Sequence, residues 1–228
     1  MSVIHMRARF MSLLIAACLA ACGSLLVIQP VKAASNAGIR IRVVDQHGEP
    51  VANAVLELPI AAVQQAPAEV AIIDQINKRF VPMVIAVEQG QQVNFPNNDN
   101  IRHHVYSFSE IRQFSTELYA DIPGEPITFD RAGIAVLGCN IHDSMVGYIY
   151  VSPWQHVAVT DATGTVSFTL DDNTALPASL QVWHPWSADP AQQREVSSAG
   201  LTAGAELEIQ LTINPPEQVF GFRALTQP

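Results

Sequence analysis

Positively charged residues are scarce in this chain of 228 residues, which has 12 Lys and Arg against 21 Asp and Glu and a formal charge of −9. No basic run stands out, which argues against a protein that binds nucleic acid. A long amphipathic helix is also missing, and only residues 108–120 (FSEIRQFSTELYA) could form a helical turn or two. Because 49% of the residues are nevertheless apolar, a packed core is expected.

Residues 1–34 have the features of an export signal. Two arginines precede an apolar run over residues 10–28, and VKAAS then offers a small-residue cleavage site after Ala33 or Ala34. We therefore predict a signal peptide over residues 1–34 and a periplasmic mature protein with no membrane span. Removal of this signal peptide would leave 9 basic and 21 acidic residues, a net charge of −12.

Two alternatives to simple cleavage remain open. The apolar run approaches the length of a membrane span, so the segment could remain as an N-terminal anchor. The sequence LAAC, which ends at Cys22, resembles a lipoprotein-processing site. Both alternatives also place the rest of the protein outside the cytoplasm.

Cysteine is nearly absent from the predicted mature chain, which retains only Cys139. A lone thiol in an oxidising compartment cannot form an internal disulfide, so another group is expected to occupy it. In the stretch GCNIHDSM, Cys139 is followed at intervals of three by His142 and Met145. A tight loop can bring these three side chains round one point, and strand pairing could add His103 or His104 from RHHV.

A thiolate, two imidazoles and a thioether suit copper, since two His and one Cys with a weak axial Met form the blue-copper arrangement. Successive strand residues face opposite ways, so only one of the adjacent histidines can reach the metal. We predict one type 1 copper ion held by His103, Cys139, His142 and Met145. A zinc site is a minor alternative, because Met is not a usual zinc ligand. A Cys–His nucleophile lacks an orienting third group, and no CxxCH motif supports a c-type haem.

Short apolar or alternating segments with Gly and Pro between them predict an all-β fold, a sandwich or barrel. We expect strands within residues 39–44, 51–58, 82–95, 127–138, 146–151, 156–170, 179–185 and 205–213.

Residues 70–152 resemble the cupredoxin (blue copper) family, in particular amicyanin and plastocyanin. The spacing C-x2-H-x2-M is that of the short amicyanin ligand loop, and FVPMVIAVEQGQQVNFPNND and RHHV resemble the strands and the first His segment. Periplasmic proteins labelled "methylamine utilization protein" are similar too. The resemblance implies a Greek-key β-sandwich and a copper electron carrier in which His142 is the ligand nearest the surface. The sequence departs from amicyanin in Ile141 and Asp143, where prolines flank the second His, and in His104, where amicyanin has Asn.

The flanks, VVDQHGEPVANAVLELPI and VTDATGTVSFTLDD, resemble the two parts of a carboxypeptidase-regulatory-like domain, an immunoglobulin-like or transthyretin-like sandwich. We therefore predict that residues 37–66 and 153–214 form one sandwich, in or on which the cupredoxin (70–152) is inserted or packed, with a loose tail at 215–228. The alternative is that residues 37–62 form an extra hairpin on the cupredoxin.

Four protein ligands leave no open position for a substrate, so the prediction is electron transfer and not an enzyme. We expect an exported type 1 copper protein that cycles between Cu(II) and Cu(I). Asp143 beside His142, on an acidic protein, predicts a redox partner, a cytochrome or dehydrogenase, that docks through a basic patch. A protein that sequesters or delivers copper, and a structural β module with a vestigial site, remain as alternatives.

Overall fold

The computed structural model describes residues 37–61, 69–120, 124–170, 174–190, 193–199, 201 and 206–216. These residues form strands and turns and contain no helix, so the predicted all-β class is confirmed. The predicted signal peptide and residues 217–228 of the predicted tail lie outside the described residues. None of the described segments contains a helix long and apolar enough to cross a membrane.

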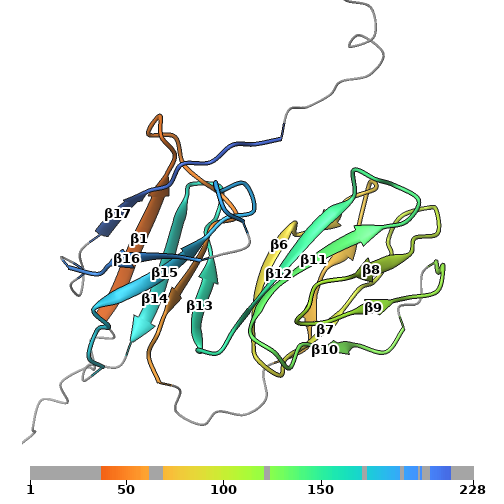
Figure 1. The fold of residues 1–228 in the computed structure, drawn as a ribbon, viewed down its shortest axis with the longest axis horizontal. Coiled ribbons are helices and arrows are strands. Elements are labelled where there is room, and N and C mark those ends of the chain that lie inside the picture. The colour runs from red at the N-terminus through yellow and green to blue at the C-terminus, as the bar shows by residue number, and fades with distance from the viewer. Residues whose placement is uncertain are drawn as a thin grey trace, which may run out of the picture. The chain divides into compact units, whose positions relative to one another are not determined.

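Strands from the two ends of the described chain build one β-sandwich, here called the outer sandwich (Figure 1). Its sheets have the orders β14-β1-β17 and β13-β2-β15-β16. The strands are β1 (Ala37–Val44), β2 (Val55–Leu58), β13 (His156–Val159), β14 (Thr165–Leu170), β15 (Ser179–Trp183), β16 (Arg194–Ser197) and β17 (Glu206–Gln210). Ile41 from one sheet and Leu56 from the other are fully buried in their shared core.

The pairing within the outer sandwich joins segments that are distant in sequence. Strand β1 pairs antiparallel with β14 and parallel with β17, while β2 lies between β13 and β15. The first two strands thus pair with strands from 156–210, as the inserted arrangement requires. The boundaries of the domains themselves stay a prediction.

The strands between β2 and β13 form the central sandwich, with sheets β6-β12-β11-β8-β9 and β10-β7-β3 and a small hairpin β4-β5. Inward residues such as Val93 and Leu137 bury completely in its core. The strands are β3 (Ala71–Ile72), β4 (Asp74–Gln75), β5 (Phe80–Val81), β6 (Val84–Glu88), β7 (Gln92–Asn94), β8 (Val105–Ser107), β9 (Phe114–Ser115), β10 (Ile127–Thr128), β11 (Gly133–Cys139) and β12 (Val146–Ser152).

The stretch 108–120 forms no helix and contains one hydrogen-bonded turn, in which the N–H of Arg112 donates to the carbonyl of Ser109 at 3.1 Å. It contains strand β9, which pairs with β8, and an isolated bridge in which Tyr119 and His103 exchange two backbone hydrogen bonds of 2.9 and 3.0 Å. Phe114 packs against Phe95 and Phe129 in the central core. Tertiary pairing therefore overrides the weak local helix preference.

The two Asp-x-x-Gly sequences of the flanks, which begin at Asp45 and Asp161, form matching turns. Asp45 Oδ1 accepts the backbone N–H groups of His47 and Glu49. Asp161 Oδ1 accepts the backbone N–H groups of Thr163 and Thr165, and the chain then turns through Gly164 at a φ of +73°. A side chain at Gly164 would have no room, because an added Cβ would lie 2.5 Å from the carbonyl oxygen of Val43 on β1. The glycine is thus required by both its backbone conformation and the close approach of β1.

We predict that Gly164→Ala lowers the free energy of unfolding by about 1–3 kcal/mol, because the methyl group meets backbone in a conformation that L residues rarely adopt. Urea unfolding measures the loss. Gly38→Ala is the matched control, since an added Cβ there has nothing within 4 Å and Gly38 has no positive φ. Equal stability of the two variants would contradict this account of the turn.

Candidate metal centre

The loop between β11 and β12 explains the spacing of the three residues in GCNIHDSM. Strand β11 ends at Cys139, β12 begins at Val146, and Gly138 pairs with Val146 across the hairpin. Inside the loop the N–H of His142 bonds the carbonyl of Cys139 at 3.3 Å, and the N–H of Met145 bonds that of His142 at 2.9 Å. Two successive i→i+3 turns place side chains three apart on one side of the chain.

Strand pairing brings the distant histidine to this loop. Cys139 lies opposite Val105 where β11 pairs with β8, and His103 precedes β8 by two residues. The backbone bridge to Tyr119 fixes His103 at that position. The His103 side chain is fully buried and Cys139 is 3% exposed, while His142 is only half-buried.

The three side chains point their metal-binding atoms at one another. The Nδ1 atoms of His103 and His142 lie 3.6 and 3.8 Å from the Sγ of Cys139. One ligand atom from each residue falls within 4.8 Å of the others. Metal–nitrogen and metal–sulfur bonds of about 2.0–2.3 Å, arranged in a plane, separate N and S donors by roughly 3.5–3.8 Å. The two observed Nδ1–Sγ separations therefore match those expected between donors that share one metal ion.

A carboxylate holds the buried imidazole from behind. The Nε2 of His103 lies 2.7 Å from Oδ2 of Asp99, and Asp99 also accepts the backbone N–H groups of Asn77 and Lys78 at 2.6 and 2.8 Å. Burial alone would raise the pKa of Asp99, but the hydrogen bonds from Lys78, His103 and Asn77 outweigh it and hold the pKa below its usual value. Asp99 remains ionised and accepts the Nε2 proton, so the Nδ1 lone pair faces Cys139.

Asp99 was not among the residues predicted from the sequence. The signal was an acidic residue four positions before a predicted ligand histidine, in the run NNDNIRHH. Only the loop between β7 and β8, which folds back over β4 and β5, makes that spacing meaningful. Asn98 donates to Asp74 and Asn97 donates to Tyr119, and these bonds hold the loop in place.

The other two residues considered as ligands, His104 and Met145, have different surroundings. His104 turns away from the group, with its Nε2 2.7 Å from Ser115 Oγ and its ring beside Tyr106. Met145 is 1% exposed and lies in the same apolar cluster as Cys139. The structure thus brings His103, Cys139 and His142 together and buries Met145 in the core next to them.

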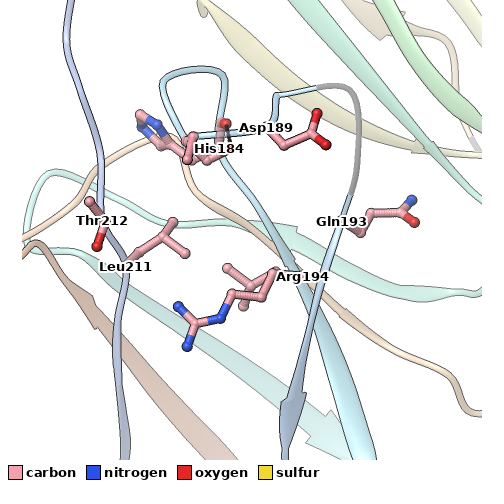
Figure 2. Close-up of a pocket in the computed structure, with 9 residues that line it drawn as sticks. His184, Asp189, Gln193, Arg194, Leu211 and Thr212 are labelled. Atoms are coloured by element: carbon pink, nitrogen blue, oxygen red, sulfur yellow. Dashed lines mark hydrogen bonds between the residues drawn. The ribbon is translucent and has the colours of Figure 1, made fainter.

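His184 of the outer sandwich belongs to a different environment. It borders a cavity of about 340 Å³ that Figure 2 shows, together with Asp189, Gln193 and Arg194. Its Nε2 bonds the carbonyl of Ala52 at 3.1 Å, its Nδ1 accepts the N–H of Trp186, and burial lowers its pKa. Both ring nitrogens are occupied, so His184 braces the loop after β15.

Comparisons with known proteins concern only part of the chain. No family model and no curated protein matches it. Among solved structures, amicyanin from Paracoccus versutus is 19% identical over 42% of this chain and 97% of its own, with a TM-score of 0.34. A purple cupredoxin from Nitrosopumilus maritimus is 21% identical over 36% of this chain and 99% of its own, also with a TM-score of 0.34.

A copper-containing nitrite reductase from Thermus scotoductus is 23% identical over 48% of this chain but only 28% of its own, with a TM-score of 0.35. All three likenesses cover less than half of this chain. What the centre binds must therefore be inferred from its own residues.

We predict that Asp99→Ala weakens metal binding at the centre by about 10–100-fold, because the His103 ring loses the partner that fixes its tautomer and orientation. Competition with a copper chelator measures the affinity. Asp99→Asn, whose amide oxygen still accepts a hydrogen bond, should lie between wild type and Asp99→Ala. The proposed role would be wrong if both variants bound the metal as tightly as wild type.

Proposed function

We propose that this chain is an exported type 1 copper protein that carries single electrons between redox partners. The observation that carries the proposal is the buried thiol of Cys139 with two imidazole Nδ1 atoms directed at its sulfur. Copper held by these three residues, with Met145 as a weak fourth ligand, would supply a one-electron couple.

The donor set fits such an ion. The Nε2 proton of His103 is used by Asp99, so its Nδ1 can only accept, and the Cys139 thiol can donate its single proton to only one of the two imidazoles. Buried polar groups that compete for one proton are costly. A soft cation satisfies the thiolate and both Nδ1 lone pairs at once.

The surroundings favour electron transfer over catalysis. His103 and Cys139 are shielded from water, and the cavities beside His184 and beside Ser144 are lined by none of the three donors. A substrate bound in either of these two cavities would therefore not contact the three donors. We propose that the protein is not an enzyme.

The partially exposed His142 supports the proposed route for the electron. Ile141 beside it is 49% exposed and Asp143 is exposed as well. An exposed imidazole edge gives a partner a short path to the buried thiolate. The carboxylate, and the net charge of −12 expected once residues 1–34 are removed, favour a partner, a cytochrome or dehydrogenase, that docks through a basic patch in the periplasm.

The spectrum of the exported protein with Cu(II) tests the proposal. We expect one copper per chain and an intense visible thiolate-to-copper band that Cys139→Ser abolishes. His104→Gln is the matched control, because it removes the neighbouring histidine that lies outside the group. A colourless protein with weak, nonstoichiometric copper binding would contradict the proposal that this protein is an electron carrier.

Retention of copper on reduction separates a carrier from a delivery protein. We expect repeated reduction and reoxidation to restore the full visible band, since the three donors come from a framework fixed by strand pairing. Loss of the band after one cycle, with copper recovered in a chelator, would favour delivery instead.

Docking through opposite charges should depend on salt. With a cationic redox partner, the second-order rate of electron transfer should fall steeply as ionic strength rises from 0.01 M to 0.15 M, because the Debye length shrinks from about 30 to about 8 Å. Stopped-flow kinetics measures the rate, and Asp143→Asn should reduce the salt dependence. A rate that does not respond to salt would exclude a charge-steered partner.

A further inference from the structure

A third apolar cluster joins the two sandwiches. Its buried members are Val55 and Trp183 from the outer sandwich and Val84 and Tyr150 from the central one. The ring of Trp183 lies 5.7 Å from that of Tyr148 and 6.0 Å from that of Tyr150, and it is 1% exposed. The aromatic residues of β12 thus pack on the outer sandwich.

A carboxyl group lies inside this apolar contact. Glu57 is the third of the four residues of β2, on the face that also carries Val55, and it is 4% exposed. Its neighbours across the contact are the hydroxyls of Tyr150 and Ser152, both on β12. Its Oε2 is buried and makes no hydrogen bond to the described residues.

The charges around Glu57 do not favour its ionised form. Among the described residues, β12 presents Tyr148 and Tyr150, and β6 presents Glu88, which is in register with Ser152. Beside Glu57, β13 and β15 present only Val157 and Gln181. The described residues place no Lys, Arg or His against this carboxyl.

The hydrogen-bond geometry points the same way. Ser152 Oγ donates its only proton to the carbonyl of Trp154 at 2.8 Å and accepts the N–H of that residue at 2.9 Å. Ser152 can therefore offer Glu57 an acceptor and not a donor. A protonated carboxyl could use that acceptor, whereas a carboxylate would meet another lone pair in an apolar contact.

We propose that Glu57, in its neutral form, clamps β12 to the outer sandwich and that the clamp loosens when Glu57 loses its proton. Burial raises the pKa of Glu57 above its ordinary value and outweighs the hydrogen bonds to Ser152 and Tyr150, which lower it. A group whose pKa is raised by folding contributes its full stabilisation below the ordinary carboxyl range, and that contribution is lost as the pH rises through the raised pKa. The contact is therefore tight in acid and looser in alkali.

The clamp bears on the metal-binding hairpin, although it does not depend on what the centre binds. Strand β12 begins one residue after Met145, and Tyr148 lies three residues after Met145, about 10 Å along the chain. Glu57 and Trp183 thus act as positioning residues that hold this hairpin from the side opposite the central core.

The exposure of Trp183 to a quencher tests the clamp without any metal. In the full protein carrying Trp154→Phe and Trp186→Phe, Trp183 is the only remaining tryptophan. We expect its quenching by acrylamide to increase several-fold between pH 4 and pH 9. Adding Glu57→Gln, which keeps the shape and cannot ionise, should keep quenching low throughout. Adding Glu195→Gln instead, at an exposed position on β16 of the same sheet, should leave the pH response unchanged.

Two outcomes would overturn the proposal. One is a Trp183 that stays equally shielded from pH 4 to pH 9 without the Glu57 substitution. The other is an increase in quenching that survives in Glu57→Gln. Neither outcome bears on the copper spectrum, so the clamp and the proposed function fail independently.

Discussion

The pairing of β8 with β11 is the constraint on which the candidate metal centre depends. Cys139 and His142 belong to one loop and could approach each other in many conformations, but His103 is far away in sequence. The register that sets Cys139 opposite Val105 brings the His103 imidazole to the thiol. Because a one-residue slip would turn every side chain of a strand to the other face, this register decides which of two adjacent histidines faces the sulfur.

The second requirement is that the donors be held still, and here β12 has two faces with different tasks. Ile149 and Val151 point into the central core and are fully buried. Tyr148 and Tyr150 point the other way and pack on Trp183. A hairpin that packs against other elements on both faces leaves its loop little freedom to rearrange. Donors that are already ordered bind a metal ion with a smaller loss of conformational entropy.

Much of the strand pattern could be predicted because it depends on local alternation. Strands such as β1, β11 and β12 lie where apolar runs between Gly and Pro placed them. The short strands β3, β4, β5, β8, β9 and β16 were not predicted. Two-residue strands such as β9 carry too few side chains for a period to show, and they exist because a neighbour such as β8 pairs with them.

The candidate site divides in the same way. The three-residue spacing of Cys139, His142 and Met145 is written in the sequence because one loop holds them all. Asp99 and Glu57 are not visible in this way, since their roles arise from partners on other strands. In the sequence VLEL, Glu57 looks like the solvent-facing charged residue of an ordinary strand. It is buried only because the second sandwich packs on its face of β2.

The two carboxyl groups show how one side-chain type serves opposite purposes. Asp99 is surrounded by donors, the N–H groups of Asn77 and Lys78 and the ring of His103, so its ionised form is stabilised and it can orient a ligand. Glu57 meets aromatic rings, the single hydroxyl donor of Tyr150 and a serine whose proton is already used, and its burial outweighs these contacts, so its neutral form is favoured. The difference lies in the number of donors that each position supplies. The same protein therefore has an ionised carboxylate beside the candidate donors His103, Cys139 and His142 and a buried carboxyl, favoured in its neutral form, against the face of β12 that packs on Trp183.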